Sequence, residues 1–61
     1  MKKYVIFEEF GKLKATAEEN YNRAIIDGNK IINLREFSTA HEAARILKHY
    51  LHLTDEQVII V

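Results

Sequence analysis

A helical stripe of apolar residues between residues 40 and 52 constrains the fold most. Its members recur three and four positions apart, the spacing that places side chains on one face of an α-helix: Ala40, Ala43, Ala44, Leu47, Tyr50 and Leu51. Thr39 stands directly before the stripe and Glu42 follows it by three positions, which is typical of a helix N-cap. The sequence therefore predicts one amphipathic helix over residues 40–52, with Leu47 at the centre of its buried face.

Four segments outside this helix have the composition of β-strands. β-branched and aromatic residues cluster in residues 3–9, 30–36 and 57–61, and residues 12–17 alternate small or apolar side chains with Lys and Thr. Gly11 predicts a hairpin between the first two strands, with the second as an edge strand protected by its lysines. The segment 30–36 is expected beside the first strand. The last segment is typical of a strand covered on both faces.

Residues 18–26 fit two different structures. A helix is indicated by Thr16 and Glu19, which have the spacing of a capping box. A hairpin is indicated by Asp27-Gly28, a strong turn signal between isoleucine-rich flanks. Because the Glu and Asn residues at the start of the segment are poor strand formers, we favour a short helix.

These elements predict a single small α+β domain over residues 1–61. Its sheet has three or four mainly antiparallel strands and packs against one amphipathic helix, with a second short helix beside them. A chain of 61 residues without cysteine has little margin of stability when it folds alone. The first strand also carries apolar side chains on both faces, so it is either a central strand or one whose second face meets another chain. We therefore expect a homodimer.

Charge and targeting signals argue against a membrane and make a nucleic-acid partner the less favoured one. Nine basic and nine acidic residues give a net charge of zero, which removes the bulk electrostatic attraction to nucleic acids or membranes. The apolar run near the N-terminus stops at Glu8, far short of a signal core or a membrane span. The absence of cysteine fits the cytoplasm, where we expect the protein. A composition rich in Ile, Lys, Glu and Asn is typical of a low-GC bacterium or its phage.

No residue pattern in the chain predicts catalysis, a cofactor or a metal site. The acidic residues occur as adjacent pairs, whose side chains diverge in both helices and strands. Ser38 is the only serine, and neither glycine lies in a phosphate-binding loop. His49 and His52 could both reach one metal ion, but a third ligand at a defined position is missing. We therefore expect a protein that is not an enzyme.

Two surfaces are candidates for binding. The aromatic residues Phe7, Phe37 and Tyr50 are assigned to the core, which leaves an aromatic set that could face a protein partner: Tyr4, Phe10 and Tyr21. The polar face of the helix at 40–52 is basic and could contact phosphates: His41, Arg45, Lys48, His49 and His52. Basic residues near a helix C-terminus also complement the helix dipole, and we favour this explanation.

The sequence therefore predicts a small non-enzymatic protein-binding modulator or inhibitor, acting as a homodimer on a protein of unknown identity. The alternative is a nucleic-acid-binding domain that uses the basic face of the helix at 40–52.

Overall fold

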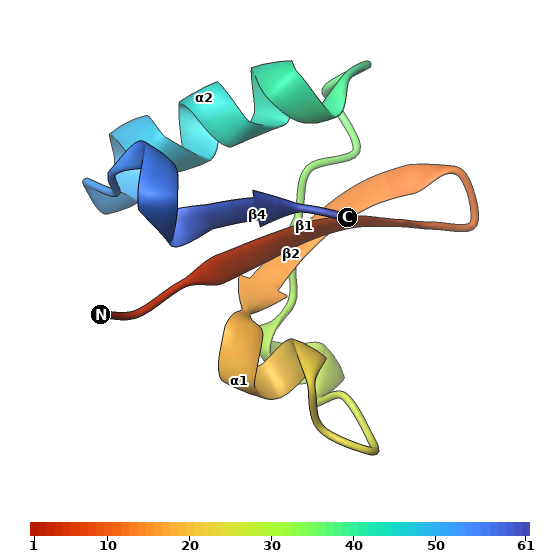
Figure 1. Ribbon diagram of the computed structural model, residues 1–61. Coiled ribbons are helices and arrows are strands. Elements are labelled where there is room, and N and C mark those ends of the chain that lie inside the picture. Colours follow the sequence, from red (N-terminus) through yellow and green to blue (C-terminus); the bar gives the residue numbers. More distant parts are fainter.

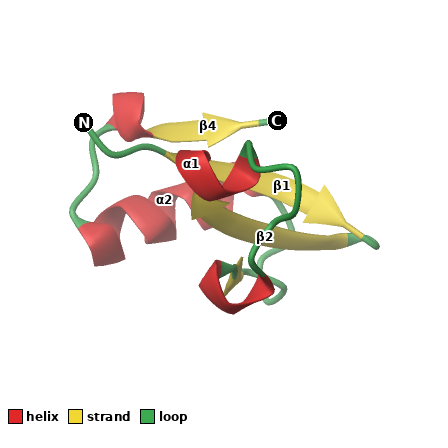
Figure 2. Ribbon diagram, turned by 90° about the horizontal axis from the view of Figure 1, so that it is seen from below, coloured by secondary structure: helices red, strands yellow, loops and turns green.

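The computed structural model describes residues 1–61 and shows a four-stranded sheet between two helical layers. The long helix α2 covers one face of the sheet, and the short helix α1 lies on the other (Figures 1 and 2). The predicted α+β class is confirmed. The elements are β1 (Tyr4–Glu9), β2 (Lys12–Ala17), α1 (Glu18–Tyr21), a 3₁₀ turn η1 (Gly28–Lys30), β3 (Ile32–Asn33), α2 (Ala40–Leu51), a second 3₁₀ turn η2 (Asp55–Gln57) and β4 (Val58–Ile60).

The strands lie in the order β3-β2-β1-β4. The pairings of β1 with β2 and of β2 with β3 are antiparallel, with Ala15 opposite both Ile6 and Ile32. The pairing of β1 with β4 is parallel, with Ile6 opposite Ile60. Helix α2 connects β3 at one edge to β4 at the other, so it crosses the whole sheet. The sheet is therefore mainly antiparallel, as predicted.

The positions of three strands differ from the predictions. β2 is an internal strand rather than an edge strand, because β3 pairs with its free side. Of the predicted strand 30–36, only Ile32–Asn33 forms a strand, and it pairs with β2 rather than with β1, whose free side is taken by β4. β4 is an edge strand with Ile60 exposed, so the predicted coverage of both its faces is wrong. The crossover of α2 sets these positions, and no local residue pattern encodes it.

The core between α2 and the sheet is built from small and branched side chains. Its buried members are Ile6, Ala15, Leu34, Ala43, Ala44 and Leu47. The predicted helix is confirmed over Ala40–Leu51, and the Thr39 hydroxyl accepts a hydrogen bond from the Glu42 N–H at 3.2 Å. Because Ala43 and Ala44 face the sheet with short side chains, α2 lies close to the sheet. Leu47 fills the remaining space between the helix and the sheet.

Tyr50 does not belong to this core, and its predicted assignment is wrong. Its side chain is 75% exposed, although it falls within the apolar stripe of the helix. It lies on the flank of α2 that faces β3, and β3 is only two residues long. The sheet therefore ends before it can cover this flank.

The second face of β1 is covered by α1 and the loop after it. Val5 and Phe7 are buried on this face, and the ring of Tyr21 lies 5.2 Å from that of Phe7. β1 is thus the central strand that one of the two alternatives predicted. Both faces of β1 are covered within the molecule. The apolar side chains on its two faces therefore no longer support a homodimer.

A buried polar network holds the loop between α1 and β3 against the sheet. The Asn20 side chain donates to Thr16 Oγ1 (2.9 Å) and to the Asp27 carbonyl (3.2 Å), and it accepts from the Asp27 N–H (3.1 Å). Thr16 Oγ1 donates to the Lys30 carbonyl at 3.0 Å. These bonds turn the chain back after Tyr21, so the helix predicted over residues 18–26 is shorter than expected.

The turn between β1 and β2 places a bulky residue in an unusual conformation. Phe10 and Gly11 both have positive φ angles, 54° and 75°, as the preferred two-residue hairpin turn requires. Glycine adopts this region freely, whereas a bulky side chain rarely does. Phe10 is also 92% exposed, so packing within the molecule does not explain it.

Candidate functional site

The three aromatic residues predicted to face a partner do not share a surface. Tyr4 is half-buried and packs against the core under α2, and the Lys2 ammonium lies 5.7 Å from its ring. Tyr21 is half-buried on the opposite face of the sheet, against Phe7. Phe10 is exposed at the hairpin tip. Of the three, only Phe10 is largely exposed.

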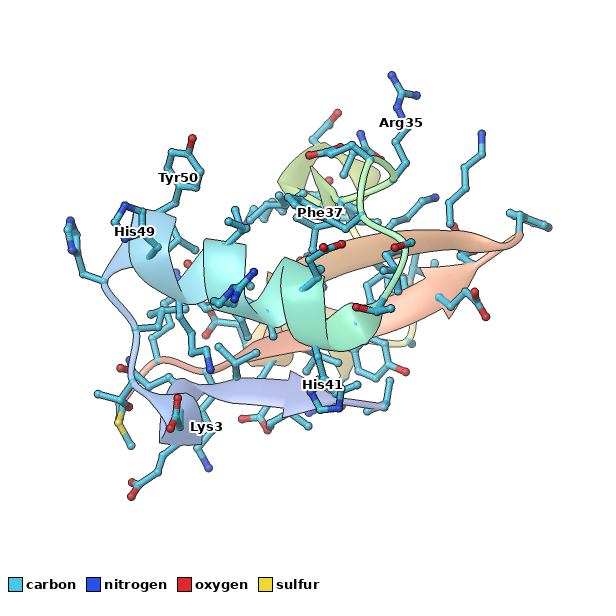
Figure 3. The ribbon with its side chains drawn as sticks, turned by 90° about the horizontal axis from the view of Figure 1, so that it is seen from above. Lys3, Arg35, Phe37, His41, His49 and Tyr50 are labelled. Atoms are coloured by element: carbon cyan, nitrogen blue, oxygen red, sulfur yellow. The ribbon has the colours of Figure 1, made fainter.

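The flank of α2 beside β3 forms an apolar groove of about 210 Å³, called here the helix-flank groove. Figure 3 shows Tyr50 projecting from α2 on the same side as Arg35 and Phe37. Tyr50 is 75% exposed and Leu51 is 38% exposed, although both border apolar neighbours. The groove is lined by Ile32, Asn33, Leu34, Glu36, Phe37, Ile46, Leu47, Tyr50 and Leu51.

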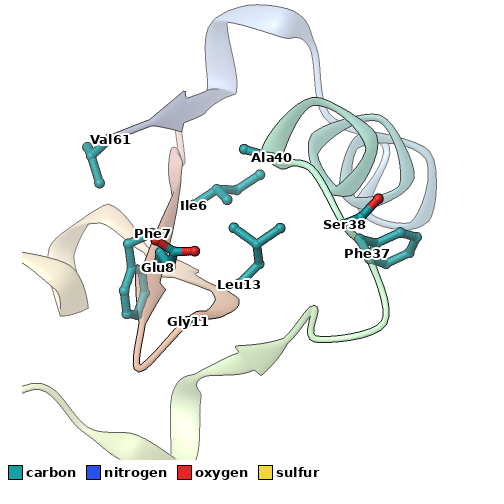
Figure 4. A pocket seen from close by; sticks show the side chains of 9 residues that line it. All are labelled: Ile6, Phe7, Glu8, Gly11, Leu13, Phe37, Ser38, Ala40 and Val61. Carbon is teal, nitrogen blue, oxygen red and sulfur yellow. The ribbon is translucent and has the colours of Figure 1, made fainter.

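A second hollow of about 360 Å³ lies between the hairpin, the start of α2 and the end of β4, and is called here the hairpin-end hollow (Figure 4). Two of its lining side chains, Glu8 and Ser38, carry polar groups, and the others are apolar or glycine. Phe37 borders both this hollow and the helix-flank groove. The hollow is lined by Ile6, Phe7, Glu8, Gly11, Leu13, Phe37, Ser38, Ala40 and Val61.

The basic face of α2 is less cationic than its sequence indicates. Lys48 is half-buried, and its ammonium donates to the Asp55 carboxylate at 2.9 Å. Arg45 is exposed and forms no ion pair. His41 and His49 lie at opposite ends of the helix (Figure 3), and His52 follows its last turn with a φ of 55°. One unpaired permanent charge is a weak basis for phosphate binding.

The Lys48–Asp55 pair predicts a small pH dependence of stability. The hydrogen bond from Lys48, and then its positive charge, lower the pKa of Asp55 below the ordinary 3.8. A carboxylate with a lowered pKa contributes stability above its ordinary pKa, and this contribution is lost as the pH falls through the folded-state pKa. We expect Asp55→Asn to make the urea midpoint fall less between neutral pH and strong acid than in the wild type.

The effect should be modest because the pair is exposed. Glu56→Gln is the matched control, since Glu56 is adjacent, exposed and unpaired. An equal change in both variants would show that the pair has no specific role.

No group of three His, Cys, Asp or Glu residues lies close enough together to hold a metal ion. No helix combines the length and apolar character that crossing a bilayer requires. No known protein family, curated protein or solved structure matches this chain. The groove and the hollow are therefore the features of the molecule that bear on its function.

Three groove residues of α2 were not predicted from the sequence: Tyr50 and Leu51 were assigned to the buried face of the helix, and Ile46 had no assignment. The available signal was the pair Ile46 and Tyr50, which are four residues apart and lie to one side of the stripe through Ala43 and Leu47. This pair makes the apolar face of α2 wider than the part of the helix that a narrow sheet can cover.

Proposed function

We propose that the protein is a small non-enzymatic binding domain that modulates or inhibits another protein by holding an apolar segment of it in the helix-flank groove. The observation that carries this proposal is the exposure of Tyr50 at the edge of the apolar helix-flank groove. Tyrosine supplies a large, rigid contact area at a small cost in side-chain entropy, and it is enriched at protein interfaces. Apolar side chains exposed together on a small domain are typical of such a site.

The charges of the groove favour a protein over a nucleic acid as its occupant. Its only charged lining residue is Glu36, which repels phosphate groups. The remaining lining is apolar apart from the amide of Asn33 and the hydroxyl of Tyr50. Such a surface suits one or two apolar side chains of a protein segment, with polar contacts at the rim.

Capture of partners from the host cell tests this proposal. We expect wild-type protein and Arg45→Ala to retain the same partner, because Arg45 lies on α2 outside the groove. Tyr50→Ala should weaken the capture by roughly tenfold or more, the effect typical of a central interface residue. The complex should survive nuclease treatment and moderate salt.

The opposite pattern would support the nucleic-acid alternative. If Arg45→Glu combined with Lys48→Glu abolished binding while Tyr50→Ala had no effect, the basic face of α2 would be the binding surface. Sensitivity to nuclease and a steep salt dependence would point the same way. The cytoplasm as the compartment, and a bacterium or phage as the source, stay predictions of the sequence.

A further inference from the structure

Phe10 combines two features that are unfavourable in an isolated molecule. Its backbone lies in the left-handed region, which bulky side chains rarely adopt, and its ring is 92% exposed. Asparagine or glycine at position 10 would adopt this turn conformation more easily and would expose less apolar surface to water. Residues held in such conformations concentrate at functional sites. We therefore expect the Phe10 ring to contact another molecule.

The hairpin-end hollow beside Phe10 is large enough for a phenyl ring. Its volume is about 360 Å³, whereas a cavity of roughly 150 Å³ already accepts benzene. Gly11 lines the hollow but Phe10 does not, so the molecule does not fill its own hollow. One end of the protein thus presents an exposed ring beside a hollow that is lined mostly by apolar side chains. An interface that pairs identical surfaces needs this kind of self-complementarity.

The charges at the hairpin are self-complementary as well. Glu9 and Lys14 form an ion pair at 2.7 Å within the chain. Glu8, which lines the hollow, and Lys12, two residues after Phe10, are exposed and have no such partner. In a dimer built on Phe10, the exposed Glu8 of one copy and the exposed Lys12 of the other would bring opposite charges to the same hairpin ends. Twofold symmetry repeats this arrangement.

We propose that the protein forms a symmetric dimer in which Phe10 of each copy fills the hairpin-end hollow of the other, flanked by reciprocal Glu8–Lys12 pairs. The dimer uses a different surface from the helix-flank groove, so it goes beyond the proposed function.

Sedimentation of the purified full chain from micromolar to near-millimolar concentration tests the dimer. The wild type should shift from monomer to dimer across this range, and Phe10→Asn should weaken the association by roughly tenfold or more. Asparagine tolerates the left-handed conformation, so Phe10→Asn should melt at a higher temperature than wild type when both are dilute. Loss of the dimer in a variant that is more stable cannot arise from unfolding.

Charge exchange gives the second test. Glu8→Lys and Lys12→Glu should each weaken the dimer, and the two changes together should restore it, because the reciprocal pairs are re-formed with opposite polarity. A wild type that remains monomeric throughout, or a Phe10→Asn variant that associates as tightly as wild type, would overturn the dimer. Partner capture that depends on Tyr50 would then still stand.

Discussion

Replacing Leu47 with alanine is expected to remove about 2–5 kcal/mol from the free energy of unfolding. This loss is comparable to the whole stability of a domain of this size. Leu47 is only 4% exposed and packs among Ile6, Ala15 and Leu34. Its neighbours on the helix face are alanines, which are too short to fill the cavity that the substitution leaves.

Thermal unfolding followed by circular dichroism measures this effect. Leu51→Ala is the matched control, because it makes the same chemical change on the same helix at a position that is 38% exposed. We expect the control to retain a cooperative transition and Leu47→Ala to be largely unfolded at room temperature. Equal losses in the two variants would show that α2 is anchored by a different set of side chains.

Replacing Asn20 with alanine is expected to lower the free energy of unfolding by about 2–4 kcal/mol, because each buried polar group left unpaired costs about 1–3 kcal/mol. Asn20 is 3% exposed and makes three hydrogen bonds, two of them to the backbone of Asp27. Besides Asn20, only the Thr16 hydroxyl bonds this segment to the sheet through a buried side chain, by its hydrogen bond to the Lys30 carbonyl. The part of the loop around Asp27 should therefore come away from the sheet.

Urea unfolding measures the loss of stability, and limited proteolysis locates it in residues 22–31. Asn22→Ala is the matched control, since Asn22 is exposed and its side chain makes no hydrogen bond. If both variants lost the same stability, the network would be dispensable and burial of Phe7 and Tyr21 alone would hold the loop.

The elements that the sequence predicted well depend on neighbouring residues. α2 begins at Ala40, directly after Thr39, because both the cap and the apolar stripe act over a few residues. The hairpin of β1 and β2 likewise needs only Gly11 and two flanking patterns. The order of the strands could not be predicted, because it depends on where the chain goes after the long crossover through α2.

The candidate site was only partly visible in the sequence for a related reason. Helical periodicity shows on which side of α2 Tyr50 lies. It does not show whether the sheet extends far enough to cover that side. Tyr21 was taken as exposed because the packing of α1 over Phe7 was not foreseen, and Tyr4 because its packing under α2 was not foreseen. Phe10 needed no tertiary information, since a hairpin tip lies beyond any packed layer.

Because β1 and β4 are parallel, the start of the chain before β1 and the end of the chain after β4 lie at opposite ends of this strand pair. The Lys2 carbonyl accepts a hydrogen bond from the Gln57 side chain, directly before β4, whereas the Val61 N–H donates to the Ile6 carbonyl further along β1. An affinity tag or fluorophore at Met1 therefore leaves the hairpin end open. The same label joined to Val61 starts at the wall of the hollow and would compete with any ring that enters it.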